Sequence, residues 1–157
     1  VIMRRKTKTK KINISDPMYG SPLVGKFINY IMRGGKKSVA QEVVYKCFDI
    51  IKAKTKGDPI ELFDKAIKNI TPALEVKSRR VGGANYQVPQ PVRPERKLQL
   101  VFRWIIIAAK AKKGKPMSEK LAEELMLAAN NEGAAVKKKL DTHRMAESNR
   151  AFAHFSW

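Results

Sequence analysis

The chain of 157 residues carries 33 Lys or Arg against 14 Asp or Glu, which gives a formal net charge of +19. Its 43% of hydrophobic residues suffice for one packed core, but the longest apolar run, residues 104–109, is far shorter than the roughly 20 residues of a membrane span. The single Cys47 can form no internal disulfide, and no Cys/His cluster has zinc spacing. These features exclude a membrane-spanning protein and a disulfide- or zinc-stapled fold, and they predict one domain over residues 1–157.

Most of the positive charge lies in two segments. Residues 1–15, the basic tail, carry six basic residues and no acid, and residues 77–115 carry eleven basic residues with Glu95 as their one acid. The other 103 residues carry a net charge of only +3. A nearly neutral body with two cationic segments is typical of a protein that binds a polyphosphate such as a nucleic acid.

Three helices are predicted after the tail. The first begins at Ser21-Pro22, a capping residue followed by a first-turn proline, and ends at Gly34-Gly35. The second spans about 36–54 and ends before Gly57. The third opens at Asp58-Pro59 and closes at Thr71-Pro72. The apolar face expected for the second helix consists of Val39, Val43, Val44, Cys47, Phe48 and Ile51.

After the third helix, the spacing of apolar residues changes from a helical pattern to that of an extended strand. Residues 74–81 and 84–88 flank Gly82-Gly83, a pair that can adopt the positive φ angles of a two-residue hairpin turn. This β-hairpin arm, residues 74–88, places Lys77 and Arg79 on one face and Arg80 on the other. Because its strands carry little apolar surface, we expect the arm to become ordered on a partner.

Three more helices are predicted in the second half. Pro89, Pro91 and Pro94 are expected to exclude regular structure as far as Glu95, where the fourth helix begins. A basic loop, residues 112–116, separates it from a fifth helix that starts near Ser118 and ends at Asn130-Asn131.

The sixth helix follows Gly133, with Val136, Leu140 and His143 at near-helical spacing. The predicted fold is therefore mainly α: a six-helix bundle with one protruding β-hairpin arm between the third and fourth helices and a basic N-terminal tail.

Two basic features are candidate phosphate contacts. Gly34-Gly35-Lys36-Lys37 lacks the lead and the preceding strand of a P-loop, so it predicts no NTPase. Two lysines at a helix start could hold an RNA phosphate or form a solvated turn. Arg79 and Arg80 on a narrow ribbon fit a groove or junction in which guanidinium groups clamp phosphates. Tyr86 on the same ribbon could stack on a base or pack at the base of the ribbon.

No enzyme, cofactor or metal site is predicted. His143 and His154 lie far apart without a carboxylate at ligand spacing, and no Ser/His/Asp or Cys/His arrangement is present. Two alternatives to an RNA-binding structural protein remain. A non-specific nucleic-acid-packaging protein would use phosphate contacts alone, and an RNA-modifying enzyme would need a cofactor loop or an acid/base pair. The hairpin and the irregular basic loops favour folded RNA over a uniform duplex.

The residues also resemble a known family. Ser21, Leu23, Phe27-Ile28, Gly35 to Lys37, Val43-Val44 and Cys47 agree with the N-terminal pattern of the bacterial and organellar small-subunit ribosomal protein seven family. The segments that resemble this family nearly letter for letter are 74–77, 79–88 (RRVGGANYQV), 92–96 (VRPER), 130–138 and 142–155. The sequence departs from the family at Gln90-Pro91 and at Ser156, beside the final Trp157.

This resemblance implies a structural protein that is a primary binder of small-subunit rRNA. It implies docking on the three-prime major domain, nucleation of head assembly, and a place near the exit-site tRNA and the mRNA exit path, beside other head and platform proteins. The location it implies is the ribosome of the cytoplasm or of an organelle. The implied rRNA contacts are Arg4, Arg5, Lys6, Lys8, Lys10, Lys11, Lys36, Lys37, Lys77, Arg79, Arg80, Arg93, Arg96 and Lys97.

Overall fold

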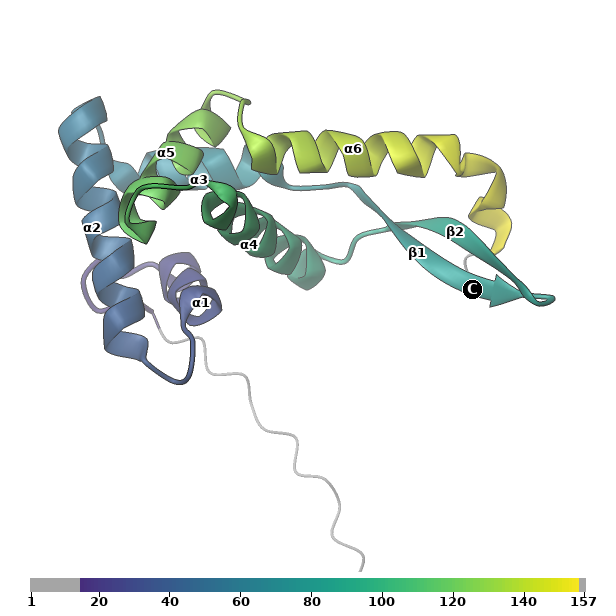
Figure 1. Cartoon of the computed structure of the whole chain (residues 1–157), viewed down its shortest axis with the longest axis horizontal. Coiled ribbons are helices and arrows are strands. Elements are labelled where there is room, and N and C mark those ends of the chain that lie inside the picture. Colours follow the sequence, from purple (N-terminus) through teal and green to yellow (C-terminus); the bar gives the residue numbers. More distant parts are fainter. Residues whose placement is uncertain (1–14, 156–157) are drawn as a thin grey trace, which may run out of the picture.

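A computed structural model describes residues 15–155 of the chain as helices with one two-stranded sheet (Figure 1). The elements in chain order are α1 (Pro22–Ile31), α2 (Lys37–Thr55), α3 (Pro59–Ile70), β1 (Leu74–Val81), β2 (Ala84–Pro91), α4 (Pro94–Ala111), α5 (Met117–Ala129), α6 (Ala134–Ser148) and the 3-10 helix η1 (Arg150–Phe155). The prediction of six helices with a β-hairpin between the third and fourth is confirmed. The short helix η1 is an addition that the sequence did not indicate.

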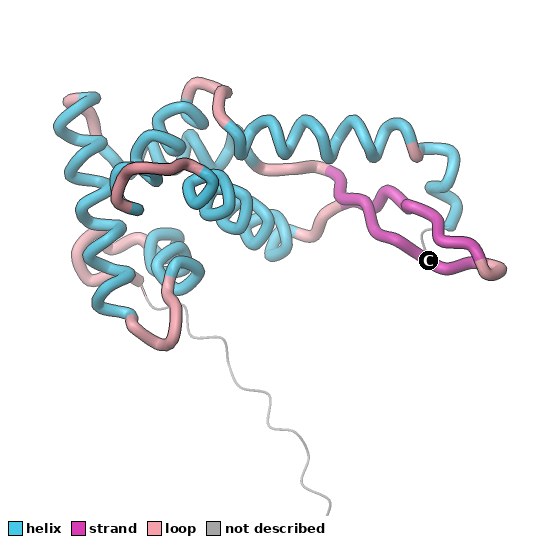
Figure 2. The backbone as a smooth tube through the Cα atoms, viewed as in Figure 1, coloured by secondary structure: helices cyan, strands magenta, loops and turns pink. Residues whose placement is uncertain are grey.

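Helices α1 to α5 gather at one end of the molecule, and α6 extends away from them (Figure 1). The antiparallel hairpin β1–β2 projects in the same direction and lies beside α6 and η1, as the strand colouring of Figure 2 makes plain. The molecule is therefore elongated, with a helical bundle at one end and the hairpin turn at the other.

The core of the bundle is built around aromatic rings from four different helices. Phe27 of α1, Phe48 of α2, Phe63 of α3 and Phe102 of α4 are all fully buried. The centroid of the Phe27 ring lies 5.2 Å from those of both Phe63 and Phe102, and the Phe48 and Phe63 centroids are 5.6 Å apart. Burial of each ring contributes about 1.5–3 kcal/mol. This cluster ties the two helices that flank the hairpin, α3 and α4, to the rest of the bundle.

The start of α3 and the end of α2 follow from local chemistry. The Asp58 carboxylate accepts a hydrogen bond from the backbone N–H of Ile60 at 2.9 Å, and Pro59 occupies the first helical position, so the predicted capping is confirmed. Helix α2 ends at Thr55, two residues before Gly57, because Lys56 adopts the left-handed conformation with φ of 53°.

Two apolar side chains that were expected to be buried are exposed. Val39 of α2 is 52% exposed because the buried positions repeat at helical spacing from Ala40, which leaves Val39 at the edge of that face. Leu140 of α6 is 59% exposed. The buried face of α6 is built instead from small residues, among them Ala135 and Ala146. Small side chains allow this helix to approach its neighbours closely. The hydrophobicity of Leu140 therefore predicted its burial wrongly.

The prolines after the hairpin do not exclude regular structure as expected. Strand β2 continues through Pro89 and Pro91, which pair in register with Val76 and Leu74. Both strands of a two-stranded sheet are edge strands, so the missing N–H groups of alternate prolines leave the ladder intact when those positions face outward.

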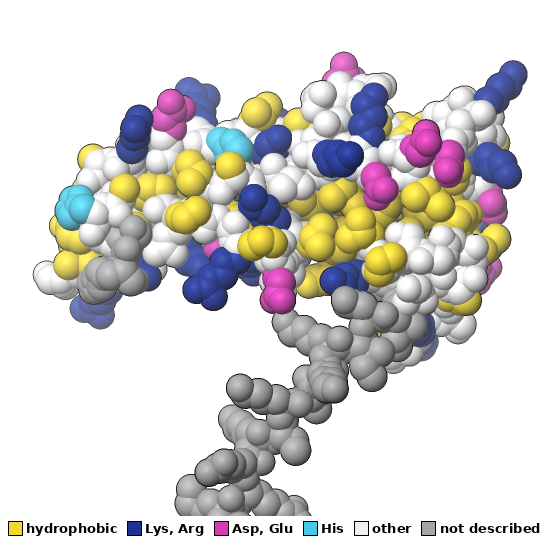
Figure 3. All heavy atoms as spheres, turned by 180° about the vertical axis from the view of Figure 1, so that it is seen from behind, with side chains coloured by type: hydrophobic (Ala, Val, Ile, Leu, Met, Phe, Trp, Pro, Cys, Tyr) yellow, Lys and Arg dark blue, Asp and Glu magenta, His cyan; other side chains and the backbone are white. Residues whose placement is uncertain are grey.

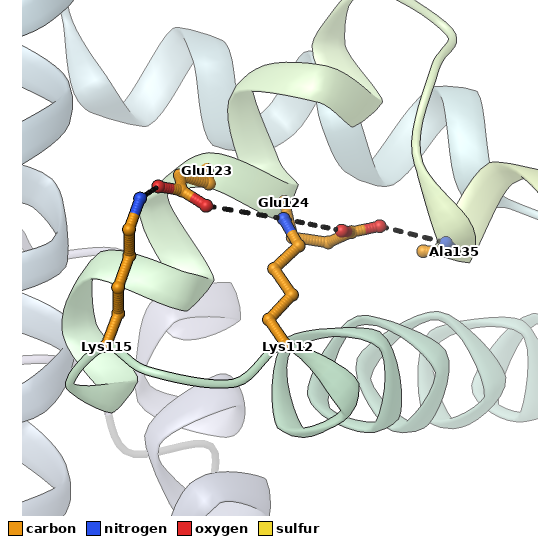
Figure 4. Close-up of polar contacts among 5 residues, drawn as sticks. All are labelled: Lys112, Lys115, Glu123, Glu124 and Ala135. Carbon is orange, nitrogen blue, oxygen red and sulfur yellow. Dashed lines mark hydrogen bonds and ion pairs between the residues drawn. The ribbon is translucent and has the colours of Figure 1, made fainter.

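The side chain of Glu124 holds the start of α6 against α5. Glu124 is fully buried, and its Oε1 accepts a hydrogen bond from the backbone N–H of Ala135 at 2.9 Å (Figure 4). Its Oε2 lies 3.0 Å from Lys112 Nζ, close enough for an ion pair but without the angle of a hydrogen bond. A carboxylate near the first N–H groups of a helix is stabilising. This contact fixes the direction in which α6 leaves the bundle.

A second polar junction ties the ends of α3 and α5 to α6. The Asn69 side-chain amide donates to the carbonyl oxygens of Ala128 and Ala129 at 2.9 and 3.0 Å, and Lys139 Nζ donates to the Asn69 carbonyl oxygen at 2.7 Å. The last carbonyl groups of a helix have no partner within the helix, and these side chains supply one. The junction lies just before the hairpin in the chain and so anchors its base.

Candidate nucleic-acid interface

The first described residues contact the bundle through a buried aspartate. The candidate contacts of the tail, Arg4 to Lys11, lie outside the described residues. Asp16 is only 3% exposed, and its carboxylate accepts hydrogen bonds from the backbone N–H groups of Met18 and Tyr19 at 3.2 and 3.1 Å and from the Tyr45 hydroxyl at 2.8 Å. Burial and this contact with Asp16 raise the pKa of Tyr45 to about 12. The chain is therefore held against α2 at Asp16.

The turn between α1 and α2 presents two of the candidate lysines. Gly34 and Gly35 adopt φ angles of 57° and 74°, which reverse the chain. Lys36 and Lys37 follow at the start of α2, both are exposed, and the first turn of this helix contains no acid. The partial positive charge of the helix N-terminus thus adds to the positive charges of the two lysines, and together they favour binding of an anion. This turn lies at the bundle end, far from the hairpin turn (Figure 1).

The hairpin has the predicted two-residue turn. Gly82 and Gly83 have φ angles of 58° and 89°, and Val81 pairs with Ala84 across them. In the register of the two strands, Lys77 lies opposite Val88 and Arg79 opposite Tyr86. Directly opposed residues share a face, so Lys77 and Arg79 lie on the face that carries Tyr86, and Arg80 is exposed on the other face.

Tyr86 packs against two aromatic rings of η1 on this face of the hairpin. The centroid of its ring lies 5.2 Å from those of both Phe152 and Phe155 in η1. The arm thus packs against α6 and η1 of its own chain, and its ordering on a partner stays a prediction. Stacking of Tyr86 on an RNA base stays a prediction.

The cations of the hairpin and of α4 meet at one carboxylate that the sequence reasoning missed. Glu75 Oε1 lies 3.2 Å from Lys77 Nζ, and Glu75 Oε2 lies 3.2 Å from Arg96 Nε. Arg93 occupies the N-cap position of α4 without a side-chain capping hydrogen bond and is exposed, and Lys97 follows Arg96 in the chain. The period-two spacing of Glu75 and Lys77 on one strand was a signal for the first ion pair. Nothing local indicated the partner on α4.

The basic loop at residues 112–116 is partly neutralised by α5. Lys115 forms an ion pair with Glu123, and Lys112 lies between Glu123, at 3.9 Å, and Glu124 (Figure 4). The contact with Lys115 lowers the pKa of Glu123, and that with Glu123 raises the pKa of Lys115, so both groups stay charged near neutral pH. Two lysines of this loop are therefore engaged within the protein.

His143 of α6 holds the base of the hairpin. The backbone N–H of Ala73 donates to His143 Nε2 at 3.1 Å, so this nitrogen is an acceptor and the ring is neutral with its proton on Nδ1. Burial, with a smaller contribution from Lys139, lowers the pKa of His143 from its usual 6.5.

Acidification is therefore expected to destabilise the protein through His143. At pH values about one unit or more above 6.5, this histidine is neutral in both the folded and the unfolded chain, and its contribution to stability is complete. As the pH falls below that value, the unfolded chain takes up the proton before the folded chain does, so the free energy of unfolding decreases. Urea unfolding between about pH 7.5 and 5.5 measures this decrease. His143→Gln should reduce it and His154→Gln should not; an unchanged pH dependence in His143→Gln would contradict the assignment.

The two ends of the molecule differ in surface charge. On the face seen in Figure 3, acidic side chains gather over the bundle, at the right, whereas the hairpin and α6 half, at the left, carries mainly Lys and Arg.

Burial raises the pKa of the Cys47 thiol to about 12, so it remains protonated in the core. Among residues 15–155 no group of three His, Cys, Asp or Glu is placed to hold a metal ion. Within the same range, no helix has both the length and the apolar character needed to cross a membrane.

The chain is similar in sequence to known proteins over nearly its whole length. Residues 3–150 match the family described as ribosomal protein S7p/S5e. The chain is 58% identical to small ribosomal subunit protein uS7 of Thermotoga neapolitana, over 99% of this chain and 100% of that protein. It is 56% identical to uS7 of Moorella thermoacetica, over 98% and 99% of the two chains. The chain therefore belongs to the ribosomal protein S7 family, whose members are structural proteins of the small ribosomal subunit and not enzymes.

Proposed function

We propose that this chain is a primary rRNA-binding protein that docks on the three-prime major domain of small-subunit rRNA and nucleates assembly of the subunit head. Membership in the S7 family supports an rRNA partner. The observation that carries the proposal is the meeting of hairpin and α4 cations at Glu75, which joins two otherwise separate basic elements into one surface. In the assembled subunit, the protein lies beside other head and platform proteins, near the exit-site tRNA and the mRNA exit path.

Binding is proposed to combine a preformed shape with phosphate contacts. The helical bundle and the hairpin supply a rigid outline that matches folded RNA, and the cations neutralise phosphates and release counterions. The residues proposed to contact rRNA are Arg4, Arg5, Lys6, Lys8, Lys10, Lys11, Lys36, Lys37, Lys77, Arg79, Arg80, Arg93, Arg96 and Lys97. Because the α1–α2 turn and the hairpin turn lie at opposite ends of the molecule, the rRNA must extend along the protein to reach both.

A competition experiment tests this proposal. Purified protein is titrated with a transcript of the three-prime major domain of small-subunit rRNA, in the presence of duplex DNA of equal length, across a salt series. A specific assembly protein binds the transcript about 1,000-fold or more tightly than the DNA at physiological salt. A non-specific packaging protein is expected to lose affinity for the transcript and for the DNA equally as salt rises, and this result would overturn the proposal.

A further inference from the structure

One acidic side chain lies buried within the basic surface. Glu75 is 8% exposed, and its two carboxylate oxygens hold cations from two different elements, Lys77 of β1 and Arg96 of α4, each at 3.2 Å. Arg96 is oriented further by its Nη1, which donates to Gln99 Oε1 at 3.4 Å. The carboxylate thus links a cation of the hairpin to a cation of α4.

A carboxylate at this place is costly in two ways. Removing a charge from water is unfavourable unless it is paired, and a negative charge beside phosphate-binding groups repels any polyanion. A surface selected only for strong attraction to phosphate would have no acid here. The cost indicates that Glu75 contributes something other than affinity.

Both cations remain accessible while they are held by Glu75. The side chain of Lys77 is 53% exposed and that of Arg96 is 38% exposed. A guanidinium group has five N–H donors and an ammonium group has three, so one bond to Glu75 leaves donors on each for phosphate oxygens. The ion pairs therefore fix the two side chains without occupying them fully.

We propose that Glu75 is a specificity-determining residue of the RNA-binding surface. It holds Lys77 and Arg96 at a set spacing, so that a folded RNA with phosphates at the matching spacing gains both contacts with little loss of side-chain freedom. Its charge at the same time weakens binding to every polyanion that lacks this match. The inference rests on the proposed function, because it assumes that the surface binds rRNA.

The test is the specificity ratio of a Glu75→Gln variant, which keeps the shape of the side chain and removes its charge. The ratio compares the dissociation constant for duplex DNA with that for the three-prime major domain transcript. We expect it to fall about 5- to 10-fold, through tighter binding of DNA and weaker binding of the transcript. Glu42→Gln is the matched control, since it makes the same charge change on an exposed acid of α2 and should leave the ratio unchanged. Thermal unfolding must show that the variant is folded, because an unfolded chain with this net charge would still bind DNA and would lower the ratio by itself.

A second variant keeps the proposal testable if Glu75→Gln does not fold. Arg96→Lys preserves the charge but cannot reproduce the orientation set by Glu75 and Gln99, so the specificity ratio should fall while the salt slope stays the same. Retention of the full ratio by either folded variant overturns the inference. Failure of the proposed function has a different signature: the unsubstituted protein itself then shows no preference for the transcript.

Discussion

Alanine at both Arg79 and Arg80 is expected to weaken binding of the three-prime major domain transcript about 100-fold at physiological salt, because each lost charge-assisted hydrogen bond costs about 1.5 kcal/mol or more. The two arginines lie near the tip of the hairpin on opposite faces, so together they can reach phosphates on both sides of a groove. The slope of log affinity against log salt should also decrease by about two, since each phosphate contact contributes about one. Filter binding or fluorescence titration across a salt series measures both quantities.

The matched control for this variant removes two cations at the other end of the molecule. Lys52→Ala with Lys54→Ala produces the same net charge at the exposed end of α2, which lies far from the hairpin turn (Figure 1). This control should lose much less affinity for the transcript. Arg79 also interacts with the rest of the protein, so thermal unfolding must show that the double variant is folded. If the double variant is folded and its affinity and salt slope are unchanged, the hairpin is not part of the RNA-binding surface.

Gly133→Ala is expected to lower the free energy of unfolding by about 3 kcal/mol, the sum of a strained backbone and a steric overlap. Gly133 has φ of 96° and ψ of 169°, a region that residues with a side chain rarely adopt. A Cβ atom there would lie 2.8 Å from Glu124 Oε1 and 3.2 Å from Leu127 Cβ. Because the Glu124 carboxylate is fully buried and holds the N–H of Ala135, it cannot move aside without breaking that contact. Chemical unfolding measures the loss.

Gly114→Ala separates the two contributions. Gly114 also has a positive φ, 79°, but a Cβ atom at this position meets nothing within 4 Å. The conformational cost alone should lower the free energy of unfolding by about 1 kcal/mol. Equal losses in the two variants would show that Glu124 is free to move and that its hold on α6 is weak.

Local chemistry explains which parts of the fold were predictable from sequence. The start of α3 at Asp58-Pro59 and the turn at Gly82-Gly83 depend on residues adjacent in the chain, and both were predicted correctly. Strand β2 was predicted too short, because a proline is acceptable in a strand only when that strand is at an edge, and edge position is a property of the sheet. The burial of Ala40 in place of Val39 likewise depends on what packs against α2 and not on α2 alone.

The candidate interface was predictable in its cations and not in their arrangement. Clusters of basic residues near 36–37, 77–80 and 93–97 are visible in the sequence, since charge density needs no fold to be recognised. The link through Glu75 was not visible, because its partner Arg96 lies on another element. The pairing of Lys112 and Lys115 with glutamates of α5 was hidden for the same reason.

The packing of the hairpin against α6 and η1 has a consequence for the order of events during synthesis. A ribosome makes the chain from the N-terminus, so β1 and β2 emerge well before Phe152 and Phe155, the rings that cover Tyr86. A two-stranded ribbon by itself is only marginally stable. The nascent bundle can thus form its aromatic core while the arm still lacks its support. The arm can attain the shape described here only after η1 has been made, so the contacts proposed between the arm and RNA would follow the synthesis of η1.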